Sequence, residues 1–225
     1  MLADFCRPRR GERILDLGAG VGVIGLLLAS RHPTVRVTGV ELDRELARFA
    51  AENARSNALE ERCRVIRADL RDAPRFLPPE HFHRVVANPP YRRTGTGASP
   101  PNPGRAAARQ ELTFSLTDLA ATASALLRFG GTLCVIHLAE RLQELFKALD
   151  GCNLTPKKLR LVAPFAEAAP RLCLVSAVKG ARPGLSVLPQ LVLHEPGGRA
   201  TSQEAAMLPE NHRERREVKK HQLDK

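Results

Sequence analysis

The chain has 225 residues, of which 43% are hydrophobic and 26% are charged, and its formal net charge is +11. This composition predicts one or two globular domains with a substantial core and excludes a chain that is disordered throughout. No apolar run approaches the ~18 residues that a membrane-spanning helix needs. The first residues have neither the basic lead nor the apolar core of a signal peptide. We therefore expect a cytoplasmic protein without a membrane partner.

The cysteines and the basic residues narrow the choice of partners. The five cysteines are scattered and form no Cys-x-x-Cys pair, so we expect reduced thiols and no metal site. The positive charge favours a polyanionic partner, nucleic acid before membrane. The competing explanation is that the basic side chains only solvate the surface.

Short apolar runs alternate with amphipathic segments along the chain. Strands are predicted at residues 13–17, 35–40, 62–67, 82–87, 132–138, 158–162 and 172–179. Helices are predicted at residues 23–30, 44–57, 111–129 and 139–149. This alternation predicts an α/β fold, in which a mostly parallel seven-stranded sheet carries helices on both faces. One domain would span residues 1–180, followed by an extension (181–208), with a further candidate strand at 191–194, and a charged, disordered tail (209–225).

The first strand runs directly into a glycine-rich turn, residues 18–22, and a buried helix follows. Glycines allow the backbone to approach a ligand closely, and the helix amino terminus behind them offers unpaired N–H groups. The run from Gly20 to Gly25 also matches the dinucleotide pattern Gly-x-Gly-x-x-Gly, which is weak evidence by itself.

Three acidic residues favour one cofactor over another. Glu41 ends the second strand, where it can accept both ribose hydroxyls of a nucleoside, and Asp69, after the third strand, can accept an adenine amino group. Asp16, inside the first strand, would suit an ammonium group and would be a poor neighbour for a pyrophosphate. A ligand with an ammonium, a ribose diol, an adenine and no phosphate is S-adenosylmethionine, so a nicotinamide dinucleotide is disfavoured.

The fourth strand stops abruptly at Asn88, Pro89, Pro90 and Tyr91. Proline fixes φ and donates no hydrogen bond, so this turn is stiff. The Asn88 side-chain oxygen and the Pro89 carbonyl can both accept N–H groups of an exocyclic amine, with little reorganisation. Tyr91 can stack on a base, a contact worth about 1–3 kcal/mol. If S-adenosylmethionine donates its methyl group to such an amine, the donor is already charged. Methyl transfer then needs no strong general base.

Four motifs carry a resemblance to a known family. Residues 16–22, 41–43 and 68–70 resemble the first three motifs of class I S-adenosylmethionine-dependent methyltransferases. Residues 88–91 are similar to the fourth motif of members that methylate planar amino or amide nitrogens. The resemblance covers roughly residues 5–179 and implies a Rossmann-like fold, catalytic roles for residues 88–91, and cofactor contacts from Asp16, Gly18, Ala19, Gly20, Gly22, Glu41, Leu42, Asp69 and Leu70.

The segment from residue 88 to residue 112 looks like the bacterial tRNA(Val) adenine-N6 methyltransferase group, which implies tRNA as the acceptor. Members usually carry more residues before the first strand than residues 1–12 here. Basic residues that could contact RNA phosphates are Arg92, Arg93, Arg105, Arg109, Lys157 and Lys158.

Other functions are less well supported by the sequence. A release-factor-type glutamine-N5 methyltransferase shares the Asn-Pro-Pro-Tyr turn, but no separate amino-terminal helical domain is seen here. A DNA adenine methyltransferase would normally carry a target-recognition domain. A catalytically silent RNA-binding module is a further alternative, and the intact motifs argue against it.

Overall fold

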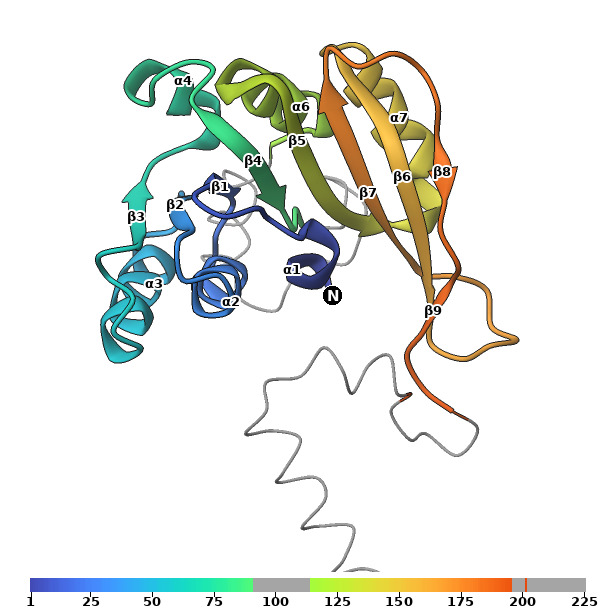
Figure 1. The fold of residues 1–225 in the computed structure, drawn as a ribbon, viewed down its shortest axis with the longest axis horizontal. Coiled ribbons are helices and arrows are strands. Elements are labelled where there is room, and N and C mark those ends of the chain that lie inside the picture. The colour runs from blue at the N-terminus through green and yellow to red at the C-terminus, as the bar shows by residue number, and fades with distance from the viewer. Residues whose placement is uncertain (91–113, 196–200, 202–225) are drawn as a thin grey trace, which may run out of the picture.

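The computed structural model describes residues 1–90, 114–195 and 201 (Figure 1). The predicted site residues Tyr91, Arg92, Arg93, Arg105 and Arg109 lie outside the described residues, as does the predicted tail, 209–225.

A single sheet forms the centre of the described part of the protein, with the order β3-β2-β1-β4-β5-β7-β6-β8 and β9 paired to β6. Its strands are β1 (Arg13–Leu17), β2 (Arg36–Glu41), β3 (Cys63–Arg67), β4 (Phe82–Ala87), β5 (Leu127–Leu138), β6 (Leu154–Ala163), β7 (Leu172–Lys179), β8 (Ser186–Val187) and β9 (Leu191–Val192). Strand β7 runs antiparallel to its neighbours β5 and β6, and the other described pairs are parallel. The predicted Rossmann-like, mostly parallel sheet with seven main strands is confirmed, and the two-residue strands β8 and β9 extend it from within residues 181–208.

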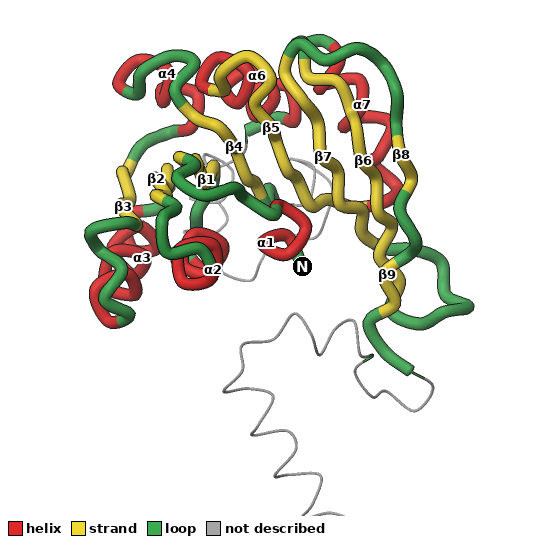
Figure 2. The backbone as a smooth tube through the Cα atoms, viewed as in Figure 1, coloured by secondary structure: helices red, strands yellow, loops and turns green. Residues whose placement is uncertain are grey.

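Helices cover both faces of the sheet, as predicted. They are α1 (Leu2–Cys6), α2 (Val23–Arg31), α3 (Arg44–Ser56), α4 (Ala73–Phe76), α6 (Leu116–Leu126) and α7 (Leu142–Asp150), with short 3-10 turns at Leu70–Asp72 and Ala139–Arg141. Figures 1 and 2 show α1, α2 and α3 on one side and α4, α6 and α7 on the other. Alternate residues of a strand face opposite sides of the sheet. Leu15 and Leu17 accordingly belong to one buried cluster, and Ile14 belongs to the other.

Several boundaries differ from the sequence prediction. Residues 127–131, predicted as the end of a helix and its glycine stop, belong to β5, because Leu127 pairs with Phe82 of β4. The register of this pair then shifts before Thr132, so an irregular stretch of strand stands where a helix end was expected. Strand β6 begins at Leu154, earlier than the predicted residue 158, and helix α1 was not predicted.

Candidate active site

Four strands deliver the predicted motifs to one edge of the sheet. Leu17 of β1 pairs in parallel with Val40 of β2 and with Ala87 of β4. Strand β3 pairs in parallel with β2 up to Glu41. Because parallel strands end at the same edge, the glycine loop, Glu41, Asp69 and Asn88 all lie at or just after the carboxyl ends of adjacent strands.

The glycine loop, residues 18–22, is fixed at its start and open at its tip. The backbone N–H groups of Gly18 and Ala19 donate to the Val40 carbonyl at 2.9 and 3.1 Å. Gly20 has a φ of +56°, and a Cβ atom there would meet nothing within 4 Å. Open space beside the backbone at Gly20 is what close approach of a ligand requires. The next glycine is tighter, because a Cβ at Gly22 would lie 3.2 Å from the Ala50 Cβ.

Glu41 links the end of β2 to this loop. One carboxylate oxygen accepts the Gly20 N–H at 2.7 Å, and the other accepts the Asp43 N–H at 2.9 Å. The residue is buried, so its charge is held in place by backbone donors. Leu42 is half-buried between Glu41 and Asp43, and Asp43 caps α3, as predicted, by accepting the N–H groups of Glu45 and Leu46.

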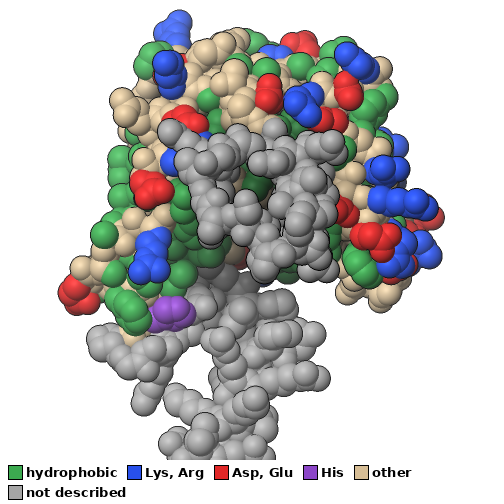
Figure 3. Space-filling view, turned by 180° about the vertical axis from the view of Figure 1, so that it is seen from behind, with side chains coloured by type: hydrophobic (Ala, Val, Ile, Leu, Met, Phe, Trp, Pro, Cys, Tyr) green, Lys and Arg blue, Asp and Glu red, His purple; other side chains and the backbone are tan. Residues whose placement is uncertain are grey.

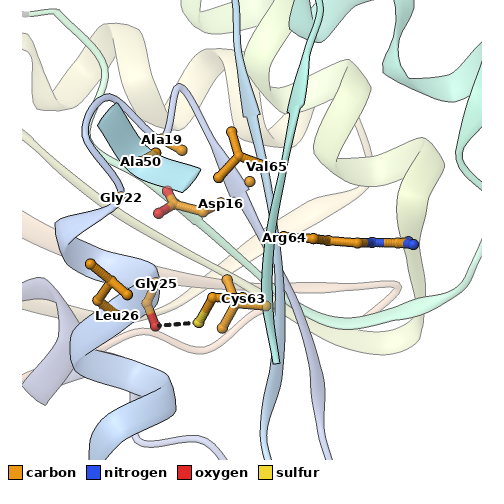
Figure 4. A pocket seen from close by; sticks show the side chains of 11 residues that line it. Asp16, Ala19, Gly22, Gly25, Leu26, Ala50, Cys63, Arg64 and Val65 are labelled. Atoms are coloured by element: carbon orange, nitrogen blue, oxygen red, sulfur yellow. Dashed lines mark hydrogen bonds between the residues drawn. The ribbon is translucent and has the colours of Figure 1, made fainter. Parts of the chain in front are cut away.

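Asp16 lies beneath the glycine loop, in a cavity between the sheet and helices α2 and α3 (Figure 4). Its neighbours there include Ala19, Gly25 and Val65. The residue is 1% exposed, and neither carboxylate oxygen has a hydrogen-bond partner among the described residues. Burial, and to a lesser extent repulsion from Glu41, raises the pKa of Asp16 to about 7, although the nearby Gly25 amide opposes the shift.

The Asp69 carboxylate already has partners within its own turn. It accepts the Arg71 N–H at 2.8 Å and the Arg71 guanidinium Nε at 3.0 Å. The hydrogen bond from the Arg71 side chain lowers the pKa of Asp69, so its carboxylate is charged at neutral pH. An adenine amino group would have to share this carboxylate with Arg71. The adjacent Leu70 is buried in the core.

The stiff turn begins where β4 ends. Ala87 is fully buried, Asn88 and Pro90 are exposed, and Pro89 is buried. Since Ala87 pairs with Leu17, Asn88 and Gly18 follow equivalent positions on neighbouring strands, about 4.8 Å apart in a typical sheet. The turn therefore starts beside the glycine loop.

The two predicted RNA-binding lysines lie elsewhere. Lys157 donates to the Arg182 carbonyl at 3.3 Å, and Lys158 lies between Ser176 of β7 and Ser186 of β8 in the sheet. Three strand spacings, roughly 14 Å in all, separate β6 from β4. The structure therefore does not bring this pair next to Asn88.

Phe114 reaches the site and was missed by the sequence analysis. Its Cε1 and Cζ atoms lie 4.0 Å from the position that a Cβ of Gly18 would occupy. The available signal was an aromatic residue immediately before a helix cap, in a chain with only 4% aromatic residues.

These features fit S-adenosylmethionine. The unpartnered Asp16 carboxylate is complementary to an ammonium, Glu41 is an acceptor beside an open glycine turn, and Asp69 is a second acceptor at the next strand end. Among the described residues, there is no group of three or more His, Cys, Asp or Glu side chains placed to hold a metal ion. No helix in the described ranges is long and apolar enough to cross a bilayer.

Comparison with known proteins identifies the family. Residues 1–151 match the sequence model of the methyltransferase small domain. The chain belongs to this methyltransferase family. The predicted class of enzyme, and S-adenosylmethionine as the cofactor of that class, are confirmed.

Individual relatives carry more specific names. The chain is 31% identical over 212 residues to the tRNA1(Val) (adenine(37)-N6)-methyltransferase of Tolumonas auensis, covering 93% of this chain and 86% of the relative. It is 35% identical over 136 residues to the protein of that name from Porphyromonas gingivalis, covering 60% of this chain and 52% of the relative. The matched part thus spans about half the length of the Porphyromonas protein.

A solved structure shows the likeness in three dimensions. A predicted O-methyltransferase from Agrobacterium tumefaciens superposes with a TM-score of 0.73 at 30% identity, and the match covers 89% of this chain and 90% of that one. The methyltransferase fold of the described residues is thus shared over this length.

Proposed function

We propose that this protein transfers a methyl group from S-adenosylmethionine to the exocyclic N6 of an adenine in tRNA. The observation that carries the proposal is the turn at Asn88, Pro89 and Pro90, which begins beside the glycine loop on the neighbouring strand. A stiff turn rich in acceptors suits an amine that must be held and aimed.

The cofactor would be held by residues at or near the carboxyl ends of β1, β2 and β3. Glu41 accepts the ribose hydroxyls, Asp69 accepts the adenine amino group, and Asp16 supports the ammonium end from below the glycine loop. Backbone atoms of Gly18, Ala19, Gly20 and Gly22 line the approach, with Leu42 and Leu70 beside the two acids. When bound, S-adenosylmethionine supplies a methyl group on a positively charged sulfonium.

The turn after β4 would act on the acceptor nitrogen. The lone pair of an exocyclic amine is delocalised into the ring, which makes the nitrogen a poor nucleophile. If the Asn88 carboxamide oxygen and the Pro89 carbonyl accept its two N–H groups, the nitrogen is drawn toward tetrahedral geometry and its lone pair is aimed. The prolines keep both acceptors in place, so little reorganisation is needed. Tyr91 would stack on the base.

Transfer RNA is favoured as the acceptor by two facts. Relatives that cover most of this chain are named as tRNA1(Val) adenine-37 N6 methyltransferases, and the chain carries a net charge of +11. On the face seen in Figure 3, basic and acidic side chains are interspersed over the described surface. We assign the phosphate contacts to Arg92, Arg93, Arg105 and Arg109, which follow the turn in sequence, and to Lys157 and Lys158 as a more distant group. Such a reaction belongs in the cytoplasm.

The direct test offers S-adenosylmethionine with a tritiated methyl group to total tRNA, total protein and duplex DNA in parallel. Label in tRNA that digests to N6-methyladenosine is the expected result. Label confined to protein would replace the proposal with glutamine-N5 methylation, which the same turn can support. If no fraction accepts label while the cofactor binds, a non-catalytic role would take its place.

A further inference from the structure

Phe114 lies beside the glycine loop of the proposed site. It directly precedes Ser115, the cap of helix α6, so its backbone position is tied to the start of that helix. Its side chain is partly buried and packs against the cluster that contains Leu17, Leu70 and Ala87. The cluster also contains residues of β5, β6 and β7, so it places the ring on this face of the sheet. The contact with Gly18, which follows β1, places the ring beside the glycine loop.

The ring of Phe114 lies beside Gly18. Cε1 and Cζ lie at ordinary van der Waals distance, 4.0 Å, from the point where a side chain of Gly18 would begin. Gly18 itself is held by the hydrogen bond from its N–H to the Val40 carbonyl. A ligand that lies against the glycine loop at Gly18 would therefore lie close to the ring of Phe114.

A purely structural role for Phe114 has a definite form. The residue occupies the position before the helix cap, and Leu119, which is buried, occupies the fourth helical position. An apolar pair at these positions is a hydrophobic staple that fixes the entry of the chain into a helix. That role predicts an effect on stability, and it predicts no distinction between a charged and a neutral ligand.

We propose that the Phe114 ring contacts the sulfonium end of S-adenosylmethionine through a cation–π interaction. This inference rests on the proposed function, which supplies S-adenosylmethionine as the ligand and Asn88 as the place of transfer. Aromatic rings attract a cation within about 6 Å of the ring centroid, and the sulfonium is the cationic centre that must lie near Asn88 for transfer. Phe114 thereby favours the charged methyl donor over the neutral product S-adenosylhomocysteine.

The test measures binding of both ligands by calorimetry, without turnover. Phe114→Leu keeps an apolar residue before the helix cap. We expect it to lower the affinity for S-adenosylmethionine about 2- to 30-fold, which is the range of single cation–π contacts. The affinity for S-adenosylhomocysteine should fall much less. The matched control is Phe165→Leu, which removes another partly exposed ring that packs against His194, outside the site.

A second variant covers the case in which Phe114→Leu fails to fold. Phe114→pentafluorophenylalanine preserves the shape of the ring and reverses its quadrupole, so it should lower affinity for S-adenosylmethionine selectively. If the folded variants lost affinity for both ligands equally, or for neither ligand, the inference would be overturned. Phe114 would then be only a hydrophobic staple. If the wild-type protein bound neither ligand, the failure would instead lie with the proposed function.

Discussion

The Glu41 carboxylate accepts the backbone N–H of Gly20 at 2.7 Å and so joins the end of β2 to the glycine loop. The same side chain accepts the Asp43 N–H, which begins helix α3. One buried carboxylate therefore holds the glycine loop and the start of the helix together. A ribose diol would meet an acceptor whose position is already set, which reduces the reorganisation needed on binding.

The first prediction concerns this residue. Glu41→Gln replaces one charged acceptor with an amide donor, so both the loop contact and the ribose contact weaken. Hydrogen bonds to charged groups contribute about 1.5–3 kcal/mol, and we expect the Kd for S-adenosylmethionine to rise about 10- to 100-fold. Calorimetry measures the change. The control is Glu60→Gln, at an exposed position, and wild-type affinity in Glu41→Gln would remove Glu41 from the cofactor site.

The second prediction concerns the pH dependence of stability. The pKa of Asp16 rises from 3.8 to about 7 on folding, chiefly through burial. The folded protein therefore binds more protons than the unfolded chain between these values, and the contribution of Asp16 to stability falls as pH rises from about 4 to about 7. At about 1.4 kcal/mol per pKa unit, the upper limit is roughly 4 kcal/mol.

Asp16→Asn isolates this contribution. The free energy of unfolding, measured in denaturant at pH 5 and pH 8, should fall less with pH in Asp16→Asn than in the wild-type protein. The exposed Asp150→Asn should behave like the wild type. If an ammonium binds beside Asp16, cofactor binding near pH 7 should also release a proton, detected by calorimetry in buffers of different ionisation enthalpy. Identical pH slopes for wild type and Asp16→Asn would contradict the assignment.

The third prediction tests how closely β2 supports the glycine loop. A Cβ at Gly39 would lie only 2.9 Å from the Ala19 Cβ and 3.4 Å from Val65. Gly39→Ala should therefore push the glycine loop away from the sheet. This should lower the free energy of unfolding by about 1–3 kcal/mol and lower the affinity for the cofactor. Gly151→Ala is the matched control, because its Cβ would meet nothing closer than 3.5 Å. Thermal unfolding and the Kd distinguish the two variants, and equal behaviour would show that the loop has room to move.

Local patterns predicted the elements that carry the cofactor motifs. Strand β1 and strand β4 begin and end where the sequence indicated, because each is a short run rich in apolar residues that ends at a glycine or at the Asn-Pro-Pro turn. Helix α3 begins after Asp43 because the capping signal is local. These elements required no knowledge of distant neighbours.

Features set by tertiary contacts were not predictable in the same way. The start of β5 depends on pairing with Phe82, and apolar spacing could not distinguish it from the end of a helix. Strand β7 is inserted between β5 and β6, which moves Lys157 and Lys158 away from β4. The pairing of Asp69 with Arg71 is a side-chain choice that periodicity does not report.

The last prediction concerns the turn itself. Asn88→Ala removes one of two proposed acceptors for the amine and leaves Pro89 and Pro90 to hold the backbone. The loss of one preorganised hydrogen-bonding group at a reacting centre typically lowers kcat about 10²- to 10³-fold. The Kd for S-adenosylmethionine should stay close to the wild-type value, because the assigned cofactor residues lie at or near the ends of β1, β2 and β3. Single-turnover methylation of tRNA and calorimetry on the same preparation separate the two effects. If kcat were unchanged, Asn88 would not hold the acceptor; if Kd rose in step with the loss of kcat, the side chain would serve the cofactor instead, and the assignment of the β4 turn to the amine would have to be abandoned.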